Sequence, residues 1–140
     1  MMLSPLKILR KYILPTMSMI RSTEKLEDIA DWLSQRKEKG LNIIGTHSGA
    51  FHCDEALAVA MLTSLPEMAP YGVVRSRNSE IHEAADILVD VGGIFDEEKK
   101  RFDHHQGSFH GTFSADHTVR LSSAGLVYKY YGRRVLEVLG

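Results

Sequence analysis

The fold is decided by the segment Leu41-Asn42-Ile43-Ile44-Gly45-Thr46-His47-Ser48-Gly49-Ala50-Phe51-His52-Cys53-Asp54-Glu55. Residues 41–45 are short, β-branched and bounded by glycines, which predicts a buried strand. A polar loop follows, and residues 54–65 then predict a helix that is apolar nearly all round, so it must be covered on several sides. In open α/β sheets ligands bind at such a junction, because the carboxyl end of the strand points into the crevice.

The segments on either side continue the alternation of strands and helices. Upstream, an apolar stripe with helical spacing predicts an amphipathic helix over residues 24–39. Downstream, the patterns predict strands at 72–76 and 86–91, a short helix at 79–85, a hairpin joining 94–95 to 101–102, a loop over 106–120, and a helix that starts at Ser122 or Ser123 and stops near Gly132. This order predicts an α/β fold with a mostly parallel sheet flanked by helices.

Composition limits the classes of protein to consider. The 140 residues suit one domain or a large part of one, and the net charge of −1 gives no bulk positive field for binding nucleic acid. Cys53 is the only cysteine, which excludes an intramolecular disulfide and a cysteine-based zinc site. The apolar runs are shorter than the ~20 residues of a membrane-spanning helix.

The first 22 residues form a basic, acid-poor leader. Their charges alternate with apolar residues, as in a mitochondrial transit peptide. The alternative interpretation is a disordered or weakly helical leader without an address.

The segment Phe102-Asp103-His104-His105-Gln106 is the main candidate for chemistry, because neither imidazole falls on a repeating apolar face. The predicted topology brings further polar side chains to the same rim of the sheet. The six candidate ligands are His47, His52, Asp54, Asp90, His104 and His105. Histidines and carboxylates without thiolates suit Mn²⁺, Mg²⁺, Fe²⁺ or Zn²⁺. Six are enough for two metal ions about 3.5–4 Å apart. Asp90 is the predicted bridge, since a lone carboxylate on a central strand is otherwise costly to bury.

Each candidate also has a purely structural interpretation. A single histidine such as His47 is more often hydrogen-bonded than ligating, and Asp54-Glu55 could merely complement the helix dipole. Cys53 is predicted to be a buried, inert thiol. Three further histidines are predicted to be solvated or exposed, namely His82, His110 and His117.

Four motifs in order resemble those of the DHH phosphoesterase superfamily, and within it the melanocyte proliferating gene 1 group of exonucleases. They are Gly45-Thr46-His47-Ser48-Gly49-Ala50-Phe51-His52-Cys53-Asp54-Glu55-Ala56-Leu57-Ala58, Val89-Asp90-Val91-Gly92-Gly93, Arg101-Phe102-Asp103-His104-His105-Gln106, and Leu121-Ser122-Ser123-Ala124-Gly125-Leu126-Val127-Tyr128. The resemblance runs from about Gly45 to the end of the chain and identifies residues 41–140 as a partial DHH-type domain. The sequence patterns before it, which the resemblance does not cover, divide into a leader (1–22) and an amphipathic helix (23–40).

The resemblance implies phosphodiester hydrolysis that depends on two Mn²⁺ or Mg²⁺ ions, by a 3′ to 5′ exonuclease acting on single-stranded RNA in the nucleus and mitochondria. By position, His47, His52 and Asp90 would hold one ion, and Asp54, Asp90 and His104 the other. The implied catalytic residues are Asp103, His104 and His105. His105 would face the substrate phosphate, and Asp103 would orient the cluster.

The chain departs from the superfamily in two ways. An Asp usually stands where this chain has His52, and members bring a further Asp ligand and a second, closing domain from beyond the helix that starts at Ser122. We therefore expect residues 1–140 alone to be weak or inactive as a nuclease. Two alternatives remain: an enzyme for pyrophosphate or small oligonucleotides, and a non-catalytic metal-binding module. The basic residues that could bind phosphate are Arg75, Arg77, Arg120 and Lys129.

Overall fold

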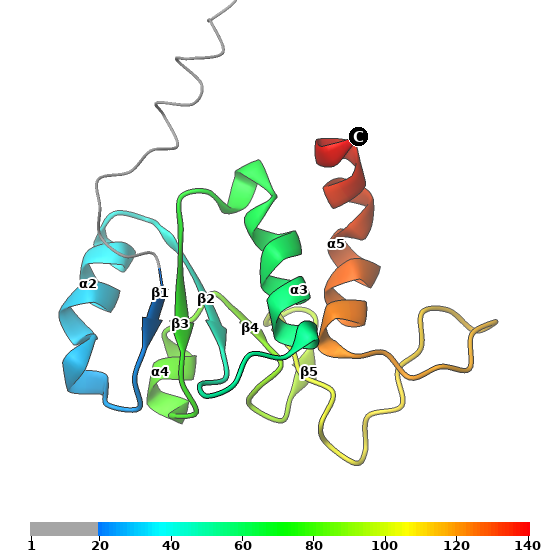
Figure 1. The fold of residues 1–140 in the computed structure, drawn as a ribbon, viewed down its shortest axis with the longest axis horizontal. Helices are drawn as coiled ribbons and strands as arrows, with labels where there is room; N and C mark the ends of the chain where they lie inside the picture. The colour runs from blue at the N-terminus through cyan, green and yellow to red at the C-terminus, as the bar shows by residue number, and fades with distance from the viewer. Residues whose placement is uncertain (1–19) are drawn as a thin grey trace, which may run out of the picture.

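The computed structural model describes residues 20–140, so the predicted leader lies outside the described residues except for its last three positions. A six-stranded sheet with the order β1-β3-β2-β4-β6-β5 runs through the molecule (Figure 1). All neighbouring strands are parallel except the β5–β6 pair. The predicted α/β fold with a mostly parallel sheet is confirmed.

The strands are short, and most agree with the predictions. They are β1 (Ile20–Ser22), β2 (Asn42–Thr46), β3 (Tyr71–Arg75), β4 (Ile87–Val89), β5 (Phe95–Asp96) and β6 (Arg101–Phe102). The predicted hairpin is the antiparallel β5–β6 pair. Strand β1 was not predicted, because three residues at the end of a basic segment have no periodicity to read. Its pairing with β3 places it at the edge of the sheet.

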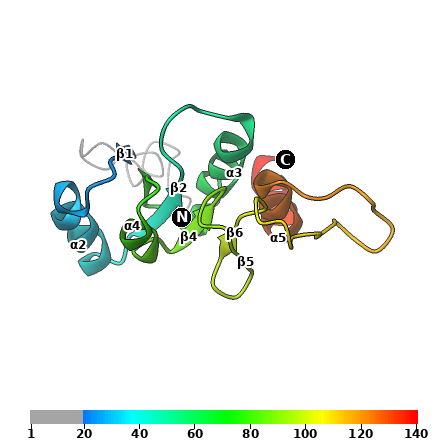
Figure 2. The ribbon, with the colours of Figure 1, turned by 90° about the horizontal axis from the view of Figure 1, so that it is seen from below.

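Helices cover both faces of the sheet (Figure 2). They are η1 (Leu26–Asp28), α2 (Ala30–Glu38), α3 (Cys53–Thr63), η2 (Pro66–Met68), α4 (Ser79–Glu83) and α5 (Ser123–Leu139). Along β2, Ile43 packs in the cluster that contains Trp32 and Ile81, whereas Ile44 packs in the cluster that contains Leu62. Successive residues of a strand point to opposite faces, so these two neighbours anchor the α2–α4 layer and the α3–α5 layer.

Two predicted helix boundaries were wrong. The helix predicted over residues 24–39 begins as α2 only at Ala30, after the 3-10 turn η1. Helix α5 does not stop near Gly132 but continues to Leu139. The ring of Tyr128 lies over Gly132, where an added Cβ would come within 2.5 Å of Tyr128 Cδ2. This glycine therefore makes room for a ring and does not end the helix. Within residues 20–140, none of the helices is long and apolar enough to cross a membrane.

Candidate metal centre

Three neighbouring strands place predicted residues at the carboxyl end of the sheet, which we call its carboxyl edge. The β2–β4 register pairs Gly45 with Leu88, and His47 and Asp90 each follow two residues later. Strand β6 lies beside β4 and leads directly into Asp103 and His104. Parallel strands share the direction of their carboxyl ends, so the register itself brings these side chains together.

His47 is the deepest histidine of the cluster, with 3% of its surface exposed. Its Nδ1 lies 3.0 Å from the carbonyl oxygen of Ser48. A carbonyl only accepts, so Nδ1 carries the proton and donates it there. The buried Nε2 has no hydrogen-bond partner among the described residues. It faces two carboxylate oxygens instead, Glu55 Oε2 at 3.5 Å and Asp90 Oδ2 at 3.6 Å.

These separations exceed ordinary N–H···O hydrogen bonds, which measure about 2.7–3.2 Å. Two donor atoms that share one metal ion at about 2.1 Å lie roughly 3.0–3.4 Å apart. The Nε2 and carboxylate oxygens around His47 are close to that spacing. Nitrogen and oxygen donors without a thiolate suit the ions that the sequence predicted.

Asp90 belongs to both groups of side chains that could hold a cation. One group is His47, His52, Glu55 and Asp90, and the other is Asp90, His104 and His105; within each, the donor atoms lie within 4.8 Å of one another. Burial, followed by repulsion from Asp54, raises the pKa of the Asp90 carboxyl. Its backbone has a φ of 59°, in the left-handed region, which turns the chain sharply after β4.

His104 lies between the two aspartates Asp54 and Asp90. Its Nε2 is 3.2 Å from Asp54 Oδ2 and 3.5 Å from Asp90 Oδ1. Asp54 also accepts hydrogen bonds from the backbone N–H groups of Ser123 and Ala124, at 3.1 and 2.6 Å. The hydroxyl of Ser123 donates to Asp90 Oδ1 at 3.2 Å. The first turn of α5 therefore holds two of the predicted ligands.

Asp103 is buried and organises the Asp-His-His segment. Its carboxylate accepts hydrogen bonds from the backbone N–H of Gly93 at 2.6 Å and of His104 at 2.8 Å, and lies 2.7 Å from His105 Nδ1. Burial pushes the pKa of Asp103 upward, but the hydrogen bonds from His105, Gly93 and His104 outweigh burial, so the pKa is lowered. The ionised carboxylate accepts a hydrogen bond from the Nδ1–H of His105, whose side chain is 62% exposed, and this contact leaves Nε2 free to meet a ligand.

Glu55 is the member of the cluster that sequence reasoning missed. It is fully buried, and its carboxylate accepts two hydrogen bonds from the backbone N–H of His52, at 2.8 and 2.9 Å. Burial pushes the pKa of Glu55 upward, but the His52 amide, His47 and Arg75 together lower it. The signal was present in the sequence, because Ala58 and Leu62 at i+3 and i+7 belong to the buried face of α3.

His52 lies at the entrance of the cluster. Its side chain is exposed, and its ring centroid is 5.1 Å from that of His47. Cys53 is exposed, so the prediction of a buried thiol was wrong. The prediction of a solvated His82 was also wrong, because this histidine is buried with Nε2 2.9 Å from the carbonyl oxygen of Ser76. His110 and His117 are exposed, as predicted.

The basic residues differ in their availability to a phosphate. Arg75 is 5% exposed and paired with Glu55, so it is not a surface cation. Arg120 donates to the carbonyl of Phe109 at 3.4 Å, and Lys129 to the carbonyl of Thr112 at 2.8 Å. Arg77 is exposed.

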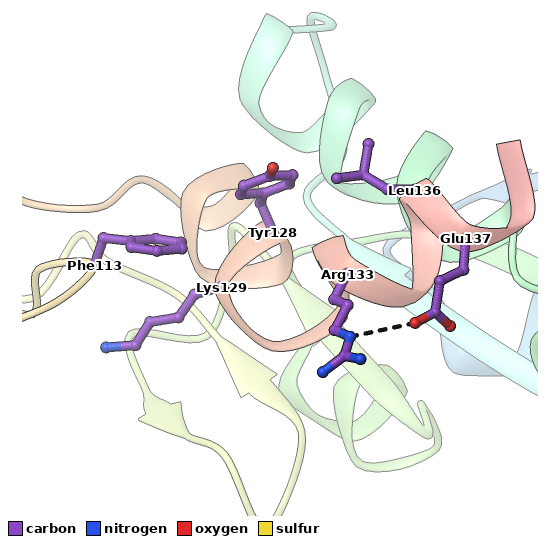
Figure 3. A pocket seen from close by; sticks show the side chains of 6 residues that line it. All are labelled: Phe113, Tyr128, Lys129, Arg133, Leu136 and Glu137. Atoms are coloured by element: carbon purple, nitrogen blue, oxygen red, sulfur yellow. Dashed lines mark hydrogen bonds and ion pairs between the residues drawn. The ribbon is translucent and has the colours of Figure 1, made fainter. Parts of the chain in front are cut away.

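A surface hollow of about 520 Å³ lies along α5, away from the predicted ligands. Its lining residues are Phe113, Tyr128, Lys129, Arg133, Leu136 and Glu137, and Arg133 pairs with Glu137 across one helical turn (Figure 3). None of the histidines or aspartates of the cluster lines it. The candidate ligands among the described residues therefore lie at the carboxyl ends of the strands and not in this hollow.

Comparison with known proteins agrees with the motifs. Residues 43–139 match the MYG1 exonuclease family, described as an uncharacterised protein family (UPF0160). A MYG1 protein of Caenorhabditis elegans is 50% identical over 104 residues, covering 71% of this chain and 31% of the relative. A MYG1 protein of Saccharomyces cerevisiae is 53% identical over 96 residues, covering 69% and 28%. The human MYG1 exonuclease is 48% identical over 101 residues, covering 69% and 27%.

The chain thus spans about 30% of the length of the curated relatives it matches. No solved structure is significantly similar to it. The match includes every candidate ligand from His47 to His105 and all of α5. With about half of the aligned residues identical and more than two thirds of the chain matched, the chain belongs to the MYG1 exonuclease family.

Proposed function

We propose that this chain binds two divalent cations, Mn²⁺ or Mg²⁺, at the carboxyl edge of its sheet, and that the metal-loaded site hydrolyses phosphodiester bonds. The supporting observation is the buried Nε2 of His47, which lacks a hydrogen-bond partner among residues 20–140 and faces the carboxylates of Glu55 and Asp90. A second set of donors, Asp90, His104 and His105, lies near the other carboxylate oxygen of Asp90. The name of the mammalian relatives, MYG1 exonuclease, supports a nuclease.

The chain's own residues would have separate tasks. Asp90 would contribute to both metal positions, with His104 and Asp54 beside the outer one. Asp103 accepts a hydrogen bond from His105 Nδ1 and so orients the ring, and Nε2 would donate to a phosphoryl oxygen when the imidazole carries both protons. When bound, paired metal ions activate a water molecule as the nucleophile and stabilise the charge that develops on phosphoryl oxygens.

The finer assignment follows the motif resemblance. We propose a place in the DHH phosphoesterase superfamily, with single-stranded RNA as the substrate and release of nucleotides from the 3′ end. The activity of the much longer relatives is part of this proposal. The basic residues 1–22 support delivery to mitochondria, with the nucleus as the second address. Imaging of residues 1–22 fused to a fluorescent protein tests the mitochondrial address, and a diffuse signal would contradict it.

Metal binding and turnover are best measured in sequence on the same protein. Calorimetric titration with Mn²⁺ should show binding that is lost in Asp90→Asn and weakened in His104→Ala. Single-stranded RNA labelled at either end then reports Mn²⁺-dependent release of nucleotides and its direction. An absence of Mn²⁺ and Mg²⁺ binding by the folded wild type would overturn the proposal.

The second candidate is a metal-binding module without catalysis. It rests on the two donor groups that share Asp90, because these groups could hold a cation whether or not hydrolysis follows. Tight Mn²⁺ binding without turnover on RNA, pyrophosphate or short oligonucleotides would support the module. Turnover on pyrophosphate or oligonucleotides but not on longer RNA would instead identify a small-substrate phosphoesterase.

A further inference from the structure

The deepest carboxylate of the cluster belongs to Glu55, to which the motif resemblance gives no role. We infer that Glu55 is a metal ligand, which joins His47 and Asp90 at the inner metal position, and that Arg75 is the residue that positions it. This inference rests on the proposed function, because it names a ligand of the same metal site.

The two oxygens of the Glu55 carboxylate face different partners. Its Oε1 accepts from the guanidinium of Arg75, at 3.4 and 3.5 Å, while its Oε2 lies 3.5 Å from His47 Nε2. One oxygen thus faces the arginine and the other faces the unpartnered nitrogen of His47. A carboxylate fixed in this way presents a single preoriented donor to a cation.

Glu55 and His52 differ in burial and in the way they are held. Glu55 is fully buried, whereas the side chain of His52 is exposed. The backbone N–H of His52 donates to both Glu55 oxygens, so the main chain of His52 holds the glutamate in place. The oxygens of Glu55 and Asp90 are each within 3.6 Å of His47 Nε2, and these three donors are the buried members of the four-residue group. His52 is left as a more loosely held fourth donor.

Four carboxylates and the Arg75 guanidinium lie close together in the cluster. Arg75 is the buried cation next to Glu55, but Asp90, Asp54 and Asp103 add three more carboxylates at the same edge. Concentrated negative charge with low exposure needs compensation. One arginine offsets one of these charges, and a divalent cation between Glu55 and Asp90 offsets two more.

Arg75 also fixes the loop between β2 and α3. Its Nη2 donates to the carbonyls of Gly49 and Ala50, at 3.2 and 3.5 Å, and its guanidinium lies 3.9 Å from the ring centroid of Phe51. The loop that contains His47 and His52 is therefore built around the same guanidinium that holds Glu55. Arg75 acts on the metal through Glu55 and the loop, and does not touch the metal itself.

The test measures Mn²⁺ binding to residues 1–140 by electron paramagnetic resonance of the free ion, which needs no substrate. Glu55→Gln keeps the size of the side chain and an acceptor for Arg75 but removes the ligand charge. We expect its Mn²⁺ affinity to fall by at least about tenfold, with a larger loss than in His52→Ala. Arg75→Lys, which removes the hydrogen bonds of the guanidinium to Glu55 and the loop, should lower the Mn²⁺ affinity by about 10–100-fold. Glu137→Gln, on the exposed side of α5, is the matched control and should bind as the wild type does.

The outcomes separate the two proposals. Wild-type affinity in folded Glu55→Gln would overturn the role of Glu55 and leave the proposed function standing. A folded wild type that binds neither Mn²⁺ nor Mg²⁺ would overturn both. If Glu55→Gln does not fold, crystals of the wild type soaked in Mn²⁺ decide by anomalous scattering. A Mn²⁺ peak about 2.0–2.3 Å from a Glu55 oxygen supports the inference, and a peak bound by His52 and Asp90 with Glu55 farther away contradicts it.

Discussion

The carboxylate of Asp54 accepts a 2.6 Å hydrogen bond from the backbone N–H of Ala124, which joins the first turn of α3 to the first turn of α5. A negative charge at a helix N-terminus is favoured by the unpaired N–H groups and by the helix dipole. Asp54 is therefore a structural cap of α5 as well as a proposed ligand, and its two roles can be separated by experiment.

Asp54→Ala should lower the free energy of unfolding by about 1–2 kcal/mol even without metal, because the first turn of α5 loses its acceptor. Urea unfolding in EDTA measures this loss. Asp116→Ala, in the exposed loop before α5, is the control and should remain within about 0.5 kcal/mol of the wild type. Equal stabilities of the two variants would show that Asp54 does not cap the helix.

Asp90→Asn should make the metal-free chain more stable at neutral pH. Burial and Asp54 raise the pKa of Asp90, so the ionised form is disfavoured in the folded state, and the neutral amide removes a penalty on the order of 1 kcal/mol. Asparagine also tolerates the left-handed φ of 59°. Because the folded pKa of Asp90 is raised, the stability gain of Asp90→Asn over the wild type depends on pH. This gain is largest above the folded pKa and disappears as the pH falls below the unfolded value of 3.8.

Thermal unfolding in EDTA at neutral and acidic pH measures the Asp90→Asn effect, and Mn²⁺ titration of the same variant should show lost binding. A variant that is less stable than the wild type in EDTA at pH 7 would contradict the prediction. Greater stability together with lost metal binding is the pattern expected of a residue kept for function.

Asp103→Asn should destabilise the fold by about 1–3 kcal/mol at pH 7, since the carboxylate accepts from Gly93, His104 and His105. The folded pKa of Asp103 is lowered, so its stabilisation is present above the unfolded value of 3.8 and is lost as the pH falls through the folded pKa. Chemical unfolding of both proteins from pH 7 to pH 3 checks this. A difference in the free energy of unfolding between wild type and variant that stays constant below pH 3.8 would contradict it.

Gly72→Ala should destabilise the chain by about 1–3 kcal/mol through overpacking. An added Cβ would come 2.5 Å from Arg36 Nε and 2.7 Å from Trp32 Cζ2, and both side chains are buried. Gly107→Ala is the matched control, because its Cβ meets nothing within 4 Å among the described residues. Calorimetric melting of both variants measures the difference, and a wild-type melting temperature for Gly72→Ala would show that Arg36 and Trp32 move aside at little cost.

Much of the fold could be predicted because its elements repeat a local pattern. β2, β4 and α3 have apolar runs with clear ends, and their positions agree with the predictions to within a few residues. The errors have physical causes of their own. Glycine often ends a helix, but Gly132 lies under the ring of Tyr128. Strand β1 gains its structure from pairing with β3 and not from its own sequence.

The site was predictable where strand ends decided it and less so where a helix face did. His47 and Asp90 follow adjacent parallel strands, so topology alone brings them together. Glu55 looked like an ordinary acid in a first helical turn, and only the burial of α3 turns it toward His47. His82 was misjudged for the same reason, since a polar helix was taken to be solvated on all sides.

The contacts of Ser123 have a consequence for the order in which the chain is synthesised. Residues 47 to 105 contain every proposed ligand, yet Asp54 and Asp90 both accept hydrogen bonds from Ser123 at the start of α5. A nascent chain that has emerged from the ribosome as far as residue 105 contains all of the proposed ligands. It still lacks the turn at Ser123 that holds Asp54 and Asp90. The metal-binding site is therefore completed only after the first turn of α5 has left the ribosome.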